Sequence, residues 1–207
     1  MKKYQYIEKA VLIGFVIAVL FSFISFTAFA GQCEEIPNEV FRLHVLANSD
    51  SEQDQALKLK VRDRLLLETS ELFAGCQTKE QAMQVARENV AKLEQIAQQE
   101  IQRQGYDYSV KIGVENVFFN NRQYGGITMP AGRYDALQVV IGEGAGQNWW
   151  CVLFPAMCLP AAERRTGMPD LNDVLSQSQM QAVEGNQYEV KFKTVEIYES
   201  IKNWFSW

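Results

Sequence analysis

The most constraining part of the chain is residues 40–65, where a strand, a polar turn and a helix follow one another with almost no slack. Apolar and polar side chains alternate over 40–46, and this period of two predicts a strand. The triplet 48–50 carries Asn, Ser and Asp side chains, which bond neighbouring backbone groups in turns. Ser51 is placed to cap a helix whose apolar residues then recur at helical spacing.

Residues 1–30 have the layout of a secretory signal peptide, in which lysines precede a long uncharged run that ends in small residues. Ala28, Ala30 and Gly31 form the candidate cleavage site. An apolar run of about 20 residues is also long enough to span a bilayer, so an uncleaved membrane anchor is the alternative. With the lysines inside, residues 31–207 are expected to form a single extracytoplasmic domain.

The negative net charge of the chain argues against some classes of binding partner. The formal net charge of the whole chain is −5, and it becomes −7 without the three lysines and one glutamate of residues 1–30. An acidic domain lacks the basic surface that nucleic acid binding needs, and it does not suit adhesion to anionic lipid. We therefore expect no nucleic acid partner, and contact with the membrane only through the N-terminal segment.

All four cysteines lie after residue 30, in the part expected to be exported, where disulfides are permitted. Cys151 and Cys158 flank Pro155, which could fold the chain back so that the two sulfurs meet. A disulfide there and two buried thiols are equally compatible with the sequence. Cys33 and Cys76 are a second possible pair. The cysteine spacing and a single histidine argue against a structural zinc site, so we expect no metal and no cofactor.

The remaining pattern predicts one layered domain. A capping box at Thr78 begins a second amphipathic helix over 79–101, which Gly105 ends. Strands are predicted over 108–119, 136–141, 149–154 and 188–192, and a last helix over 194–207. This order predicts an α/β or α+β fold, in which a mixed sheet and long amphipathic helices follow the N-terminal apolar helix.

Two groups of aromatic residues have alternative interpretations. Tryptophan is common at protein interfaces and at membrane surfaces, but it is more often part of a core. We expect Trp149 or Trp150 to be largely buried. We expect Trp204, Phe205 and Trp207 to dock on the domain, with contact with a membrane as the alternative.

Few features of the sequence support a catalytic function. The sequence has no nucleophile elbow, no zinc-protease motif and no P-loop, and the glycines of 142–146 fit a tight surface turn better than a phosphate loop. Any catalytic dyad must use His44, with Cys76 or Cys151 as its partner. Glu115 and Glu143 could serve glycoside hydrolysis if the fold sets them at the required separation. An exported hydrolase of the cell envelope is therefore the alternative function.

Polar residues gather around the end of the first predicted strand, where α/β proteins tend to build binding sites. Singly, each is most simply a structural residue. Together they are the candidate for a partner contact or for the turn that shapes it: Arg42, His44, Asn48, Ser49, Asp50 and Asp54.

Several motifs, in order, resemble the stage II sporulation protein R family. They are RLHVLANSDS at 42–51, DQALKLKVRD at 54–63, GYDY at 105–108, PAGRYDAL at 130–137, VIGEG at 140–144 and NWWCVLFP at 148–155. The resemblance covers about 37–158. Cys151 and Cys158 fit the family pattern, whereas Ala156 stands where a second proline is usual.

The resemblance implies a function that composition does not. Members of this family are made in the forespore and exported into the space between the two sporulation membranes. There they activate a membrane-embedded aspartic protease, which matures a mother-cell sigma factor. The chain is accordingly expected to be an intercellular signal and protease activator, without chemistry of its own.

Overall fold

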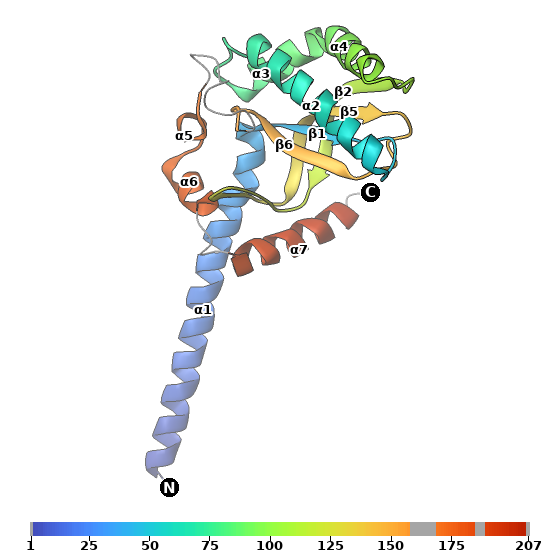
Figure 1. Ribbon diagram of the computed structural model, residues 1–207. Coiled ribbons are helices and arrows are strands. Elements are labelled where there is room, and N and C mark those ends of the chain that lie inside the picture. The colour runs from blue at the N-terminus through green and yellow to red at the C-terminus, as the bar shows by residue number, and fades with distance from the viewer. Residues whose placement is uncertain (1, 158–168, 185–188, 206–207) are drawn as a thin grey trace.

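The computed structural model describes residues 2–157, 169–184 and 189–205. A long helix, α1 (Lys2–Glu39), projects from a head that contains the other described elements (Figure 1). The head is built on a mixed sheet with helices on both faces. The α+β class and the N-terminal apolar helix expected from the sequence are thus confirmed.

The sheet has four strands in the order β2-β5-β1-β6. The strands are β1 (Phe41–Leu46), β2 (Val110–Phe119), β5 (Gly132–Ile141) and β6 (Asn148–Phe154). β1 is parallel to β5 and antiparallel to β6, and β2 is antiparallel to β5. Because β1 is central, both of its alternating sets of side chains are covered.

Three helices cover one face of the sheet and form the upper layer of Figure 1: α2 (Glu52–Leu72), α3 (Lys79–Glu88) and α4 (Val90–Arg103). The predicted stripe of α2, Leu57, Val61 and Leu65, is buried in a core that also contains Leu43. Ser51 caps α2 as predicted, because its side chain accepts a hydrogen bond from the backbone of the third helical residue.

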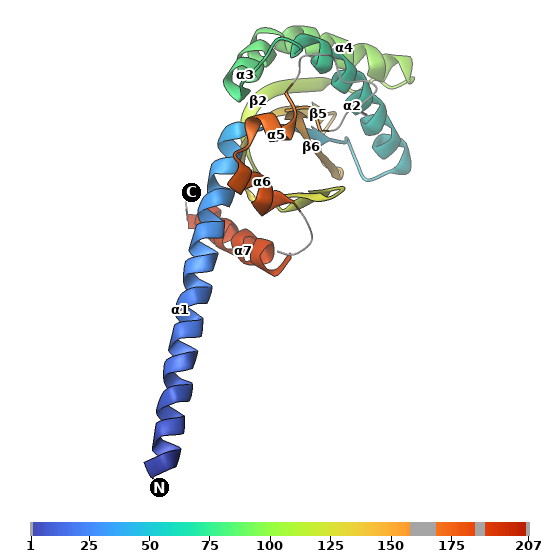
Figure 2. The same ribbon diagram turned by 90° about the vertical axis from the view of Figure 1, so that its left-hand side faces the viewer.

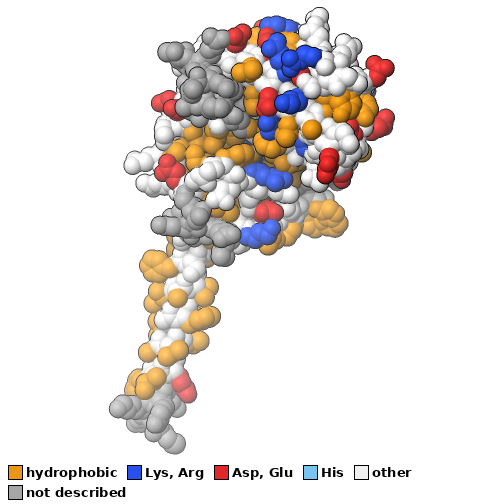
Figure 3. Space-filling view, in the orientation of Figure 1, with side chains coloured by type: hydrophobic (Ala, Val, Ile, Leu, Met, Phe, Trp, Pro, Cys, Tyr) orange, Lys and Arg blue, Asp and Glu red, His pale blue; other side chains and the backbone are white. Residues whose placement is uncertain are grey.

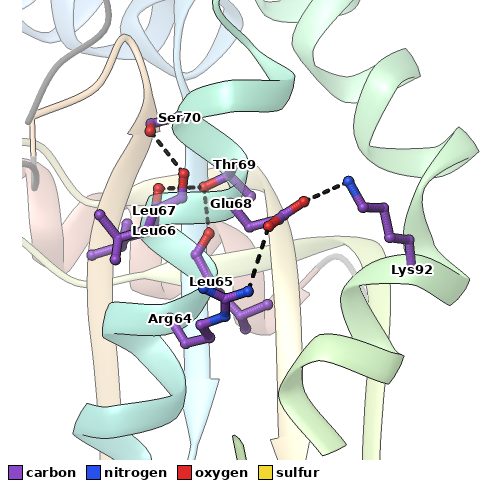
Figure 4. A network of polar contacts seen from close by, with 8 residues as sticks. All are labelled: Arg64, Leu65, Leu66, Leu67, Glu68, Thr69, Ser70 and Lys92. Carbon is purple, nitrogen blue, oxygen red and sulfur yellow. Dashed lines mark hydrogen bonds and ion pairs between the residues drawn. The ribbon is translucent and has the colours of Figure 1, made fainter. Parts of the chain in front are cut away.

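Polar contacts on α2 supplement this apolar packing (Figure 4). Glu68 pairs with Lys92 of α4 and, at 3.9 Å, with Arg64 one turn earlier on α2. The buried hydroxyls of Thr69 and Ser70 each donate to a carbonyl of their own helix at 2.8 Å. Exposed ion pairs contribute only about 0–1 kcal/mol, so the apolar core dominates the attachment of α4 to α2.

The other face of the sheet is covered by shorter elements and by the end of α1. They are the hairpin β3 (Arg122–Tyr124) and β4 (Ile127–Met129), with α5 (Leu171–Val174) and α6 (Gln177–Val183). Ile36 of α1 packs there with Phe119, Tyr134 and Met180. The sheet is thus enclosed between two layers. Most residues of β1 and β5 are protected from water, whereas β2 and the start of β6 keep exposed residues.

Two predictions of secondary structure were wrong in part. The helix predicted over 79–101 is interrupted at Asn89, whose side chain donates to the carbonyl of Val85 at 2.8 Å and thereby ends α3. The strand predicted over 188–192 belongs to helix α7 (Glu189–Phe205) in its described part, 189–192. The local alternation was too short to decide, and the spacing of Phe192 and Val195, both buried, selects the helix.

α1 has two parts with different surroundings. The side chains of residues 6–25 are exposed and mostly apolar, and the helix is long and apolar enough to cross a membrane. From Phe26 onward the helix packs on the head and buries Phe29 and Cys33. An apolar helix of this kind fits export or membrane anchoring.

Candidate functional site

The six residues of the predicted polar cluster fall into two groups in the structure. Arg42 and His44 lie inside the head on one face of β1, and they are 0% and 4% exposed. Asn48, Ser49 and Asp50 belong to the turn between β1 and α2, and Asp54 lies in the first turn of α2. β1 leads away from the end of α1, so this turn lies across the head from the point where α1 enters it (Figures 1 and 2). Because Arg42 and His44 are buried, they can influence a partner contact only indirectly, by stabilising the fold that supports the turn.

Arg42 is a buried cation held by aromatic rings. Its guanidinium carbon lies 4.0 Å from the ring centroid of Phe119 and 4.8 Å from that of Tyr134. It donates to the Tyr124 hydroxyl and, at 3.3 Å, to the carbonyl of Cys151. Burial lowers the pKa of the guanidinium, and the two neighbouring phenols counter this shift. Arg42 therefore ties the hairpin to the sheet through cation–π contacts and hydrogen bonds.

His44 occupies the next position on the same face. Its ring stacks on Trp150, and Gln138 Nε2 lies 3.1 Å from its Nδ1. Burial lowers the pKa of His44 to about 4, a hydrogen bond with Asn148 acts in the opposite direction, and the Arg42 charge adds to the lowering. The imidazole is thus neutral near pH 7 and serves as a packed core residue.

Asp54 organises the turn between β1 and α2. Its Oδ2 accepts hydrogen bonds from Asn48 Nδ2 at 2.8 Å and from the Ser49 hydroxyl at 2.6 Å. Ser49 and then Asn48 lower the pKa of Asp54, which burial alone would raise. Gln55 adds a bond to the carbonyl of Ser49 at 2.8 Å. The first turn of α2 thereby fixes the polar turn that precedes it.

The loop between β5 and β6 packs directly on this turn. Asn48 Oδ1 accepts from the backbone of Glu143 at 3.1 Å, and Asp50 Oδ1 accepts from the backbone of Gln147 at 2.7 Å. A Cβ at Gly146 would lie 2.1 Å from the carbonyl oxygen of Ser49, so only glycine fits there. Sequence reasoning placed a surface turn at 142–146 but did not find that it is the partner of the β1–α2 turn.

The outer side of this pair of segments is accessible. Asp50, Glu143 and Gln147 are exposed, and Trp149 beside them is 36% exposed with the Arg62 guanidinium 4.1 Å from its ring centroid. We call these five residues the turn–loop surface. One of Trp149 and Trp150 was expected to be largely buried: Trp150 is partly buried and stacked on His44, whereas Trp149 is exposed.

The catalytic pairings considered from the sequence do not form. β2 and β5 pair Glu115 with Ala136, five residues before Ile141, so about 17 Å of strand separates Glu115 from the loop that carries Glu143. Glycosidase carboxylates lie about 5–10 Å apart.

A catalytic dyad of His44 with a cysteine does not form, because the side chains lie on opposite faces of the sheet. Cys151 pairs with Leu43 and packs in the core on the α2 side of the sheet, whereas His44 points to the other face. Cys76 also belongs to the core on the α2 side. Within the described residues no three His, Cys, Asp or Glu side chains are grouped as a metal site would need.

A cleft between α1, β5 and α7 also contains titratable groups, but they are engaged with one another. Lys202 pairs with Glu34 at 3.1 Å and with Glu199 at 3.4 Å. Burial raises the pKa of Glu199, and Lys202 opposes that shift. This arrangement is that of an interface between helices.

The cysteine predictions have different outcomes. Cys33 and Cys76 are buried free thiols, so the pairing considered for them is wrong. They lie on opposite faces of the sheet, in separate cores. Cys151 is disulfide-bonded, but Cys158 lies outside the described residues, so the pairing of these two stays a prediction.

The candidate cleavage site lies within α1. Ala28 and Gly31 are exposed, Ala30 is partly buried, and Phe29 between them packs edge-on against Phe192 with ring centroids 5.1 Å apart. Cleavage there stays a prediction. It would remove Phe29 from the apolar cluster under α7.

Comparison with known proteins agrees with the motifs. A family model described as Stage II sporulation protein R matches residues 37–164, more than half of the chain. Stage II sporulation protein R of Bacillus subtilis (strain 168) is 37% identical over 123 residues, which cover 59% of this chain and 55% of that protein. The match thus spans about half the length of the relative, and no solved structure matches. The matched range contains the turn–loop surface and the buried Arg42, and it shows that the chain belongs to the stage II sporulation protein R family.

Proposed function

We propose that this chain is an exported signalling protein of endospore formation that activates a membrane-embedded aspartic protease. The protease then processes the precursor of the mother-cell sigma factor. Membership of the family supports a role in sporulation. The N-terminal apolar helix fits export into the space between the forespore and mother-cell membranes, with or without retention as an anchor.

Activation by a protein without chemistry of its own requires differential binding. The chain can shift the protease toward its active state only by binding that state more tightly than the inactive one. A surface that is already ordered loses little conformational entropy when it binds, which favours such selectivity.

The turn–loop surface carries the proposal. Asp54 accepts hydrogen bonds from Asn48 and Ser49 and so orders the β1–α2 turn. Asn48 and Asp50 of this turn accept hydrogen bonds from the backbone of Glu143 and Gln147 in the β5–β6 loop, so the turn and the loop hold each other in place. The side chains of Asp50 and Glu143 stay exposed. Two acidic groups beside a partly exposed Trp149 combine a charged rim with an aromatic anchor, which is a common composition of protein interfaces.

The test is reconstitution of the signalling step. Vesicles carry the protease and the sigma factor precursor, and the folded full chain is added in lipid nanodiscs while cleavage of the precursor is followed. The proposal expects cleavage well above that of the protease alone, saturating as the chain is titrated. Cleavage that stays at the level of empty nanodiscs would contradict it.

A further inference from the structure

Helix α7 has two faces of different environment. One face is buried on the head through Phe192, Val195 and Glu199, spaced at three and four residues. The opposite face is apolar and uncovered, and we call it the outer face of α7: Ile197, Tyr198, Ile201, Trp204 and Phe205. The expectation that the C-terminal aromatic residues dock on the domain is therefore wrong for Trp204 and Phe205, and Trp207 lies outside the described residues.

The exposure of this outer face is large. Ile197 and Ile201 are 54% and 52% exposed, and Trp204 and Phe205 are both 73% exposed. Single exposed apolar residues are ordinary on protein surfaces. A contiguous set on one helix instead marks a surface that binds a membrane or another protein.

The position of α7 indicates what covers it. Phe192 packs on Phe29, and Lys202 bonds to Glu34, so α7 crosses α1 just where α1 enters the head. Both views show α7 lying crosswise to α1, on the side of the head from which α1 projects (Figures 1 and 2). Its outer face, opposite the face packed on the head and on Phe29, is therefore turned away from the head, on the side from which α1 projects.

The exposed apolar part of α1 has the length of a membrane span. Residues 6–25 are exposed, and roughly 20 helical residues extend about 30 Å, the thickness of the hydrocarbon core. If this segment crosses the bilayer, the interface lies near residues 26–29, which is the level at which α7 is attached. Apolar side chains line the projecting helix and reappear at the underside of the head near the end of α7 (Figure 3).

We propose that α7 lies in the interfacial plane of the bilayer that α1 spans, with its outer face among the lipid headgroups and upper acyl chains. A lipid surface is favoured over a protein partner because the outer face continues the apolar surface of the span and shares its side of the head. Trp204 suits this depth, since tryptophan concentrates at membrane interfaces. Lys193 and Ser200 are exposed polar residues of the same helix and can remain in the headgroup layer.

Such a contact fixes the orientation of the head. One span alone leaves a domain free to tilt, whereas a span and an interfacial helix at a large angle define a plane. The head would then be held upright on the membrane through elements outside the matched range 37–164. This orientation does not depend on activation of the protease, so each can fail without the other.

The test measures the depth of α7 in the full chain. A nitroxide is attached at Ile201→Cys or, separately, at Trp204→Cys, in vesicles of phosphatidylethanolamine and phosphatidylglycerol. Both positions are more than half exposed, so the label does not disturb the core. Gln84→Cys on the exposed side of α3 is the matched control, and labelled wild-type chain gives the background of the buried thiols Cys33 and Cys76.

The expected result is an oxygen accessibility severalfold above that of a water-soluble nickel complex at positions 201 and 204, and the reverse at position 84. Nickel accessibility at 201 and 204 as high as at 84 would overturn the proposal. A short distance between labels on two chains, with both reagents excluded, would also overturn it, because a second copy would then cover the outer face.

Discussion

The His44 imidazole lies flat on the Trp150 indole, with ring centroids 3.9 Å apart and planes 6° from parallel. The two residues are partners in the register of β1 and β6, and Phe119 closes the stack edge-on to Trp150 with centroids 4.6 Å apart. Burial of this ring and the nearby Arg42 charge favour the neutral imidazole over the imidazolium. His44 is thus a structural residue whose contribution to the stability of the fold depends on pH.

The free energy of unfolding is expected to fall as the pH is lowered from about 6.5 toward 4. His44 in the unfolded chain takes up a proton near its ordinary pKa of 6.5, whereas the folded chain holds that pKa at about 4. The unfolded state therefore gains the proton first, and the stability due to neutral His44 is complete above 6.5 and lost toward 4. Urea unfolding at successive pH values measures this slope.

His44→Phe is the control for this titration. Phenylalanine keeps a ring on Trp150 but cannot be protonated, so the slope between pH 6.5 and 4 should be smaller than in the wild type. Carboxylates contribute equally to both proteins and cancel in the comparison. Identical slopes would show that His44 does not carry the effect.

Arg42→Ala should lower the free energy of unfolding by about 3 kcal/mol, as large-to-small changes at buried sites do. The change removes a fully buried side chain from three aromatic rings and leaves the Cys151 carbonyl and the Tyr124 hydroxyl without its bonds. Arg103→Ala, at a side chain 73% exposed, should change stability by less than about 1 kcal/mol. Equal effects in urea unfolding would contradict the buried role of Arg42.

Gly146→Ala should destabilise the fold by about 2 kcal/mol or more, because the added methyl group collides with the backbone of Ser49. Gly75→Ala is the matched change, since a Cβ there has no heavy atom within 4 Å. Thermal unfolding of both variants measures the difference. If both melt like the wild type, the loop does not pack on the turn as described.

Substitutions of Asp54 and Asp50 should differ in how strongly they affect the stability of the fold and the activation of the protease. Asp54→Ala leaves Asn48 and Ser49 without their shared acceptor, so it should lower stability by about 2 kcal/mol and weaken activation as the turn loosens. Asp50→Ala removes one exposed bond and should lower stability by less than about 1 kcal/mol while still weakening activation. Calorimetry and precursor cleavage are compared for each variant. Parallel losses in the two variants would assign Asp50 to the turn alone.

Local signals predicted the front of the molecule well. The strand at 41–46, the cap at Ser51 and the stripe of α2 depend on residues near one another in sequence, and each formed as expected. The cap at Thr78 also formed, although Asn89 divides the helix that it begins. Caps and periodicity act within a few residues, and therefore they can be recognised without the rest of the fold.

The site needed information that local patterns lack. Arg42 is buried because Phe119, Tyr124 and Tyr134 reach it from strands some 80 or 90 positions later, and only the pairing of β1 with β5 and the docking of the hairpin bring them there. The glycine-rich loop was recognised as a turn, but its contact with Ser49 follows from strand order, which the sequence did not specify. Likewise, the direction of the outer face of α7 depends on how Phe192 packs on α1.

The most direct measurement compares precursor cleavage driven by wild-type chain, by Asp50→Lys and by Glu115→Lys in the reconstituted system. Both substitutions reverse an exposed acidic charge, but only Asp50 belongs to the turn–loop surface. The account predicts that Asp50→Lys lowers the cleavage rate at a subsaturating concentration at least about tenfold, or about 1.4 kcal/mol, with the melting temperature within about 4 °C of the wild type. It predicts that Glu115→Lys cleaves at the wild-type rate. Equal rates for Asp50→Lys and the wild type, or no stimulation by folded wild-type chain, would contradict it.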